Sequence, residues 1–203
     1  MKLNKLMFRE YDIRGIWNED ITEEVSYYIG RAYATKLLSL KNNKMIVGYD
    51  NRLSSPIIEK NLVKGLTDGG VDVVRLGLVT TPMYYYAWDK LNIHCGIMIT
   101  ASHNPKEYNG FKMSYNGIHN CFGNEVAELY YIILNGIYSK GNGSITDANI
   151  KEDYIKMINS HINMGSNKLK VIYDCGNGTT SNVAKDIFVS NDNIEYIPLF
   201  AES

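Results

Sequence analysis

The stretch GIMITASHNPKEYNGFKMS, residues 96–114, passes from an apolar run to a polar one. The apolar run has the pattern of a buried strand, and the polar residues after it are Ser102, His103, Asn104 and Pro105. A plain polar turn is the simpler interpretation, because Pro105 restricts the backbone of the residue before it. The functional alternative rests on position, since ligands of open α/β sheets bind where strands end in loops. A serine hydroxyl there is exposed yet rigidly anchored.

Ser102 and His103 are the residue types of a serine hydrolase, but their spacing argues against that class. Adjacent side chains of an extended segment point to opposite sides, so we expect His103 to be poorly placed to take a proton from Ser102. The segment also lacks the GxSxG turn that exposes the nucleophile in such hydrolases.

Lys112 points to phosphate chemistry instead. We expect a turn at Asn109-Gly110 to lead the chain back, so that Lys112 lies near Ser102. An ammonium group beside a serine oxygen suits a phosphate better than an ester carbonyl. The simpler alternative is that Lys112 is a solvated strand residue.

Two further motifs pair an aspartate with an arginine. REYDIRG, residues 9–15, contains Asp12 and Arg14, and the planar guanidinium of Arg14 could hold a phosphate. GYDNRLSSP, residues 48–56, places Asp50 and Arg52 after a strand and before a helix, and the N-terminus of a helix favours anions. The alternatives are an ordinary ion pair in the first motif and structural ordering of the loop in the second.

Other chemistry-bearing patterns are weak. The glycine turn of YDCGNGTTS, residues 173–181, matches neither GxGxxG nor GxxxxGK[ST], so a tight turn is the better interpretation. His94, His119 and His161 lack the spacing of metal ligands, and the chain has no DxDxD cluster. We therefore expect any metal site in this chain to be incomplete.

The elements that must position these residues alternate along the chain. Helical patterns and capping residues predict helices, and short apolar runs predict strands. This rhythm predicts a three-layer α/β/α domain with a mixed sheet, in which the 110–117 strand runs antiparallel or lies at the edge. The predicted helices are 23–40, 54–70, 80–92 and 124–136, and the predicted strands are 44–50, 71–77, 95–100 and 110–117.

The stretch YSKGNGSITDAN, residues 138–149, is rich in Gly, Ser, Asn and Asp and predicts a domain boundary. We place a first domain at 1–140, a linker at 141–149 and the start of a second, similar α/β domain at 150–203. Two strands with a helix on each side would leave a sheet edge and apolar faces uncovered. We therefore expect the second domain to be truncated.

Composition and charge exclude several classes. The 203 residues carry 21 basic and 22 acidic side chains, a balance that gives no overall field to attract nucleic acid or an anionic membrane. Three scattered cysteines argue against a disulfide framework, and no apolar run approaches the roughly 18 residues that a membrane helix needs. We expect a cytoplasmic protein without a signal peptide.

Together, FREYDIRG, GYDNRLSSP, GIMITASHNPKEYNGFK and DCGNG, in this order, resemble the α-D-phosphohexomutases, in particular their phosphomannomutase/phosphoglucomutase branch. The resemblance covers essentially the whole chain. It implies an isomerase of carbohydrate metabolism that acts as an intramolecular phosphotransferase and is itself a phosphoprotein. Such an enzyme interconverts hexose 1-phosphate and 6-phosphate through a phosphoserine and a hexose 1,6-bisphosphate.

The resemblance also implies roles for individual residues. Ser102 is the phosphoryl donor and acceptor, and its phosphate is a ligand of Mg²⁺. Arg14, Lys112 and His103 are catalytic, and the substrate phosphate is bound by Tyr11, Arg14, Asn104 and Lys112. Lys112 or His103 is the candidate for proton transfer to and from the sugar hydroxyl.

Departures from the family pattern limit what this chain does alone. The family has four domains, and the acidic metal loop, the sugar-reading loop and the phosphate loop of the later ones are not in this sequence. We expect an N-terminal fragment that is inactive, or nearly so, without its C-terminal domains. The alternatives are a phosphoglucosamine mutase, against which EYDIRG argues, and a non-catalytic phosphate-binding module.

Overall fold

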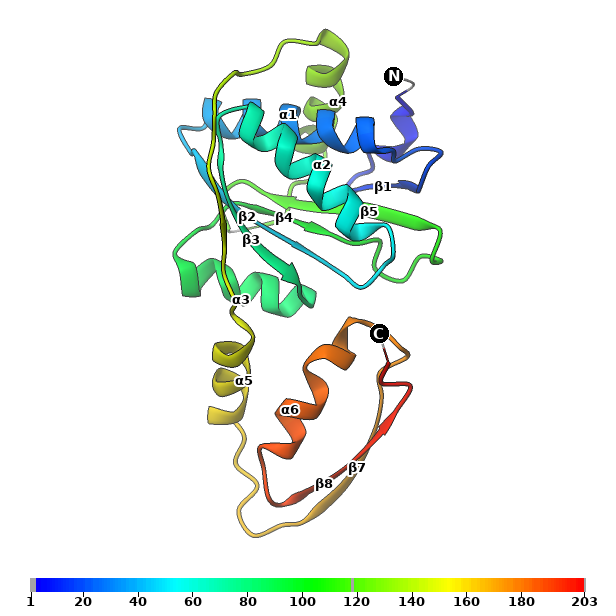
Figure 1. The fold of residues 1–203 in the computed structure, drawn as a ribbon, viewed down its shortest axis with the longest axis vertical. Coiled ribbons are helices and arrows are strands. Elements are labelled where there is room, and N and C mark those ends of the chain that lie inside the picture. The colour runs from blue at the N-terminus through cyan, green and yellow to red at the C-terminus, as the bar shows by residue number, and fades with distance from the viewer. Residues whose placement is uncertain (1–2, 118, 203) are drawn as a thin grey trace.

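The structure, a computed structural model, describes residues 3–117 and 119–202. A six-stranded mixed sheet lies between layers of helices, and a smaller unit built around a two-stranded parallel sheet follows it (Figure 1). The α/β/α fold with a mixed sheet, followed by the start of a second α/β unit, is confirmed. The strands of the large sheet are β1 (Ile13–Ile16), β2 (Lys44–Tyr49), β3 (Asp72–Leu78), β4 (Gly96–Ile99), β5 (Tyr108–Ser114) and β6 (Ile145–Asp147).

The order of the large sheet is β1-β5-β4-β2-β3-β6. Strands β2, β3, β4 and β6 are parallel, whereas β5 is antiparallel to both of its neighbours. We expected β5 to be antiparallel or at the edge. It is antiparallel but internal, because the short strand β1 near the N-terminus pairs with its outer side.

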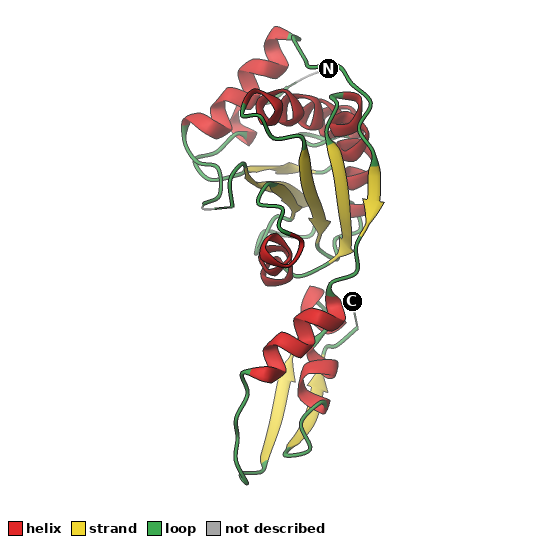
Figure 2. Cartoon of the chain, turned by 90° about the vertical axis from the view of Figure 1, so that its left-hand side faces the viewer, coloured by secondary structure: helices red, strands yellow, loops and turns green. Residues whose placement is uncertain are grey.

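Helices cover both faces of this sheet (Figure 2). One face packs against α1 (Glu23–Ser39), α2 (Ser55–Asp68) and α4 (Asn124–Asn135), and the other face packs against α3 (Thr81–Leu91). Side chains that alternate along the strands fill both cores, as the twofold period of a strand requires. In β2, for example, Met45 and Val47 belong to the first core and Ile46 to the second.

The predicted linker 141–149 is only partly a linker. Its residues Ile145–Asp147 form β6, which adds to the sheet beside β3. Arg75 of β3 and Asp147 of β6 form a bidentate ion pair, with donor–acceptor distances of 2.8 and 3.1 Å. Because β6 is short and its side chains are exposed, it lacks the apolar pattern from which strands are predicted. The division at 1–140, 141–149 and 150–203 otherwise stays a prediction.

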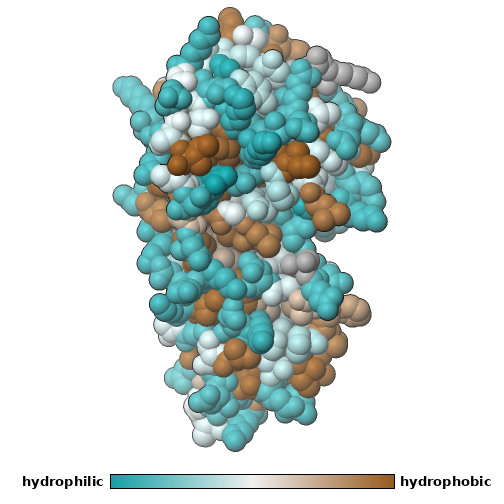
Figure 3. All heavy atoms as spheres, viewed as in Figure 1, coloured by the Kyte–Doolittle hydropathy of each residue, from teal (hydrophilic) through white to brown (hydrophobic). Residues whose placement is uncertain are grey.

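The second unit packs against the first through a small apolar contact. Ile150 and Val183 are buried in the same cluster as Met83 and Tyr84 of α3. On the face of the molecule drawn in Figure 3, exposed apolar residues are scattered in separate patches. None of the described helices is long and apolar enough to cross a membrane. The elements of this unit are α5 (Lys151–Ser160), β7 (Leu169–Asp174), α6 (Ala184–Val189) and β8 (Ile194–Leu199), with a short 3₁₀ helix at Thr179–Asn182. A second 3₁₀ helix, Lys5–Met7, precedes β1 in the first unit.

Candidate active site

A cavity of about 740 Å³ opens at the carboxyl ends of the parallel strands β2, β3 and β4. This is the edge at which the sequence predicted a ligand site. Ser102 and His103 contribute to its wall from the β4–β5 loop, and Thr179 contributes from the second unit. The other lining residues are Asp50, Asn51, Arg52, Leu53, Val79, Thr80, Thr81, Pro82, Met98, Thr100, Asn104, Lys106, Gly176, Asn177, Gly178 and Thr180.

Ser102 is held by its backbone while its side chain stays exposed. Its φ of 56° lies in the left-handed region, which costs a non-glycine residue roughly 1–2 kcal/mol. Its N–H donates to Thr100 Oγ1 at 2.9 Å, and its carbonyl accepts from Arg52 at 3.0 Å. The loop thus presents the hydroxyl to the cavity in a backbone conformation that its neighbours must maintain.

The predicted separation of Ser102 and His103 is wrong. His103 Nδ1 lies 3.4 Å from Ser102 Oγ. The expectation assumed an extended backbone, but the left-handed φ of Ser102 turns the two side chains toward the same side. His103 is exposed and lines the cavity beside Ser102.

Arg14 lies on β1, and its guanidinium reaches the serine loop. Its Nη1 donates to the carbonyl of Ala101 at 3.2 Å and to the side-chain oxygen of Asn104. Asp12 orients the guanidinium, accepting from Nε at 2.8 Å. Arg14 and Asn104, both predicted site residues, are therefore brought together, and one of their roles is to hold the loop.

The predicted turn at Asn109-Gly110 is not a turn, because both residues lie within β5. The chain reverses earlier, over 101–107, where Pro105 and the left-handed Ser102 supply the turn. Asn109 is fully buried, and its side-chain N–H donates to the hydroxyls of Ser54 and Ser55. A Cβ at Gly110 would lie 2.4 Å from the carbonyl oxygen of Ile13, so this residue is a glycine because β1 approaches closely.

Lys112 lies two residues after Gly110 on β5, opposite Met98 of β4. Strand alternation puts Lys112 on the same face of the sheet as Met98, the face that meets the cavity. Within the part of the chain that the structure describes, no hydrogen bond or ion pair engages the Lys112 ammonium. Lys112 therefore lies on the sheet face that meets the cavity but does not line it, and among the described residues it makes no hydrogen bond to Ser102.

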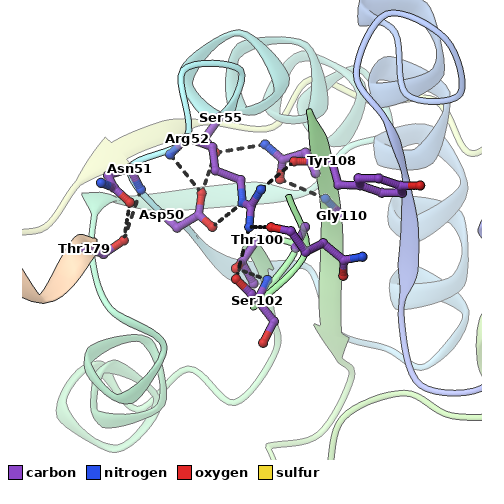
Figure 4. A network of polar contacts seen from close by, with 12 residues as sticks. Asp50, Asn51, Arg52, Ser55, Thr100, Ser102, Tyr108, Gly110 and Thr179 are labelled. Carbon is purple, nitrogen blue, oxygen red and sulfur yellow. Dashed lines mark hydrogen bonds and ion pairs between the residues drawn. The ribbon is translucent and has the colours of Figure 1, made fainter. Parts of the chain in front are cut away.

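Asp50 and Arg52 make the densest polar network of the site (Figure 4). Asp50 accepts from Arg52 Nε at 3.2 Å and from the hydroxyl of Ser55 at 2.8 Å. The guanidinium of Arg52 then reaches into the serine loop and binds its carbonyl oxygens. Of the two interpretations left open by the sequence, ordering of the loop is the one that these contacts support.

Like Arg14 and Lys112, Tyr11 is a predicted site residue that lies outside the lining of the cavity. Its side chain is 68% exposed and does not line the cavity. Conversely, sequence reasoning missed Lys106, Asn177 and Thr179 as lining residues. Lys106 follows the serine motif directly, a position that could have singled it out, whereas the other two reach the cavity only through packing of the second unit.

The side chains that the structure describes do not form a magnesium centre by themselves. Among residues 3–117 and 119–202, no three His, Cys, Asp or Glu side chains gather around a possible metal position. The carboxylates near the serine loop, Asp12 and Asp50, are each bound to an arginine. Burial raises the pKa of Cys95 to about 11 and that of Cys121 to about 12, so neither thiol is a ready nucleophile or ligand.

Comparisons with known proteins agree with this fold. The family model described as "Phosphoglucomutase/phosphomannomutase, alpha/beta/alpha domain I" matches residues 5–136. A phosphomannomutase/phosphoglucomutase of Pseudomonas syringae is 41% identical over 97% of the chain. A phosphoglucosamine mutase of Finegoldia magna is 34% identical over 91% of it. The crystal structure of a phosphoglucomutase/phosphomannomutase family protein from Burkholderia thailandensis superposes with a TM-score of 0.92, at 31% identity over 99% of this chain and 45% of that one.

The chain spans only part of these relatives, 42% of the Pseudomonas syringae protein and 44% of the Finegoldia magna protein. Within that span, the family model covers the six-stranded sheet apart from β6 and includes the serine loop. The chain therefore belongs to the phosphoglucomutase/phosphomannomutase family.

Proposed function

We propose that this chain is the phosphoserine-bearing, N-terminal part of a phosphohexomutase that interconverts hexose 1-phosphate and hexose 6-phosphate. The main support is the geometry of Ser102. Thr100 and Arg52 hold its backbone, while its hydroxyl opens into a cavity at the carboxyl ends of three strands. A residue that gives and takes a phosphoryl group needs this combination of a fixed position and an open approach.

In the proposed reaction, Ser102 starts as a phosphoserine. The free hydroxyl of a hexose monophosphate attacks phosphorus, the bond to Ser102 Oγ breaks, and the hydroxyl loses its proton to a base. The product is a hexose 1,6-bisphosphate and a serine alkoxide that is protonated as it leaves. After the bisphosphate reorients, Ser102 Oγ attacks its other phosphoryl group and loses its proton, and the bond from that phosphorus to the sugar oxygen breaks. The sugar oxygen takes up a proton as it leaves, so the isomeric monophosphate departs with Ser102 again phosphorylated.

Charge neutralisation and proton transfer are assigned to Arg14, Lys112 and His103, with Lys112 a candidate for both. Phosphoryl transfer depends on positioning and on neutralising the phosphoryl oxygens, which suits Arg14 and Lys112. His103 is the leading candidate for the proton of Ser102 because its Nδ1 is 3.4 Å from Oγ, and Lys112 is the alternative. We assign Asn104 to the loop and to phosphate binding, and Tyr11 to substrate binding through its exposed ring.

The complete reaction needs more than these residues. We propose that Mg²⁺ binds the phosphate of Ser102 with ligands from C-terminal domains, and that the same domains read the sugar. A hexose 1,6-bisphosphate serves as activator and intermediate, and the protein acts in the cytoplasm. On this account residues 1–203 alone have little or no mutase activity.

One further candidate activity has an observation in its favour. A relative named phosphoglucosamine mutase is 34% identical to the chain, so an amino sugar is a second candidate substrate. Assays of the protein from its complete reading frame with glucose, mannose and glucosamine 1-phosphates distinguish these activities. Turnover of glucose or mannose 1-phosphate supports the proposal, and exclusive turnover of glucosamine 1-phosphate supports the alternative.

A non-catalytic phosphate-binding module makes a different prediction. The reading frame of a mutase continues past Ser203 into an acidic metal loop, and its product converts one hexose phosphate into the other. A reading frame without such a loop, and a product that binds inorganic phosphate but shows no turnover, would refute the proposed function.

A further inference from the structure

Arg52 lines the cavity together with Ser102, a position typical of a phosphate ligand. Its hydrogen bonds argue otherwise. Nε donates to Asp50 at 3.2 Å, Nη1 donates to the carbonyls of Pro105 and Tyr108 at 2.6 and 3.0 Å, and Nη2 donates to those of Ser102 and Asn104 at 3.0 and 2.8 Å. A guanidinium has five N–H donors, and all five are used.

The number of N–H groups that are already hydrogen-bonded distinguishes Arg52 from Arg14. The Nη2 of Arg14 contacts only Asp12, at 2.8 Å, so at least one N–H of Arg14 remains for another acceptor. Arg52 has none to offer a ligand unless it releases the loop. The two arginines approach the same loop from β1 and from the end of β2, but only Arg14 keeps capacity for an anion.

The four carbonyls that Arg52 binds belong to residues 102, 104 and 105 of the turn and to Tyr108, the first residue of β5. Of these, the Pro105 carbonyl also accepts from the N–H of Tyr108 at 3.0 Å. One planar group therefore contacts both ends of the turn, to which Arg14 is also bonded through Ala101 and Asn104. Ser102 sits in this turn with its left-handed φ of 56°, a conformation that persists only when the surroundings enforce it.

A series of hydrogen bonds among buried polar side chains in turn holds Arg52. Asp50 accepts from the backbone N–H and Nε of Arg52 and from the hydroxyl of Ser55, and Ser55 accepts from the side chain of Asn109. Ser55 and Asn109 are fully buried. The orientation of the guanidinium is thus tied to the start of α2 and to β5 (Figure 4).

We propose that Arg52 is a positioning residue, which fixes the backbone of Ser102 for phosphoryl transfer and does not bind phosphate itself. The inference rests on the proposed function for its catalytic consequence. Its structural consequence, the left-handed turn at Ser102, is independent of that function.

The structural consequence is tested by NMR of the 203-residue chain. A left-handed residue gives a strong NOE between its own amide and α protons. In Arg52→Lys a single ammonium replaces the planar fork, so we expect the Ser102 NOE to weaken as the residue samples ordinary φ values. The matched control is Arg75→Lys, which changes an arginine-aspartate pair on β3, away from the cavity. An unchanged NOE in Arg52→Lys, or equal weakening in both variants, would overturn the inference.

The catalytic consequence is tested with the protein from its complete reading frame and glucose 1,6-bisphosphate as phosphoryl donor. We expect Arg52→Lys to lower the maximal rate of Ser102 phosphorylation about tenfold or more, because misplacing a reacting group costs rate, while the half-saturating donor concentration stays unchanged. A raised half-saturation with an unchanged maximal rate would make Arg52 a ligand. If the wild type takes no phosphoryl group, the proposed function fails, and the NMR experiment still decides the positioning role.

A milder variant covers the case in which Arg52→Lys does not fold. Asp50→Asn leaves Arg52 in place but weakens the contact that orients it. We expect partial weakening of the Ser102 NOE and a smaller loss of maximal rate. A folded Asp50→Asn protein with wild-type values for both would contradict the inference.

Discussion

At the scale of single residues, the site depends on one serine held in an unfavourable backbone conformation. The sequence predicted that Ser102 is exposed at a strand end, because an apolar run stops directly before it. It did not predict the φ of 56° or the 3.4 Å approach of His103, since both arise from contacts with residues about 50 and 90 positions away. The sequence also did not decide whether Asp50 and Arg52 order the loop or bind a ligand, because that depends on contacts with residues far away in the sequence.

The strain at Ser102 gives a stability prediction. Glycine adopts a positive φ freely whereas alanine does not, so we expect Ser102→Gly to be more stable than Ser102→Ala by about 1 kcal/mol. Chemical denaturation of the two variants measures the difference, and both should lose phosphoryl acceptance. Equal stabilities would show that the backbone at Ser102 is not strained in solution.

Glu59 of α2 gives a pH prediction. Its side chain is buried, and burial raises its pKa above the usual 4.5, although the charge of Arg75 opposes this and that of Asp147 adds to it. The folded state therefore holds the proton more tightly than the unfolded state. This stabilises the fold at low pH, and the contribution is lost as pH rises from about 4.5 through the raised value.

Replacing Glu59 by Gln removes this titration. We expect the free energy of unfolding of Glu59→Gln, relative to wild type, to increase as pH rises through that window. Urea denaturation over a pH series measures it, with the exposed Glu152→Gln as control. A difference between wild type and Glu59→Gln that does not change with pH would be inconsistent with a raised pKa.

At the scale of elements, the hairpin of β4 and β5 positions the site, with β1 as its outer support. Apart from β1 and β6, which were not predicted, the order of strands and helices in the first domain could be predicted from periodicity, but the position of this turn could not. Asn-Gly is a strong turn signal, yet here Asn109 bonds inside the sheet and Gly110 makes room for β1. Short β6 escaped prediction because its side chains are all exposed.

Gly110 should accordingly tolerate no side chain. A Cβ there would lie 2.4 Å from Ile13 O, 2.9 Å from Thr100 O and 3.1 Å from Arg14 Cγ. We expect Gly110→Ala to destabilise the fold by about 1–3 kcal/mol, because two backbones must move apart. Thermal denaturation tests this. If Gly110→Ala has the melting temperature of the wild type, the close approach of β1 and β5 is contradicted.

At the scale of the whole molecule, the second unit completes one wall of the cavity. Asn51 joins the two units: its backbone N–H donates to Thr179 Oγ1 at 3.1 Å, its side chain donates to the carbonyl of Asn177 at 2.8 Å, and Thr179 donates back to it at 3.0 Å. The sequence indicated a second unit but gave no sign of these contacts, which depend on how the units pack.

Removing the Asn51 side chain should loosen this contact. Asn51→Ala deletes two of the three hydrogen bonds, worth about 1 kcal/mol each. We expect faster amide hydrogen exchange at residues 175–180, with the serine loop unaffected. The control is Asn61→Ala on α2, whose side chain bonds only to Glu23 and Ile57 within its own unit. Unchanged exchange at residues 175–180 would show that Asn51 does not hold the units together.

The most direct test of the account asks whether Ser102 takes a phosphoryl group. The protein from its complete reading frame is incubated with glucose 1,6-bisphosphate, and the peptide that contains residues 102–106 is analysed by mass spectrometry. The account predicts one phosphoryl group per chain, located on Ser102 and absent from Ser102→Ala. Phosphorylation that persists in Ser102→Ala, or a wild-type protein that stays unmodified, would contradict it.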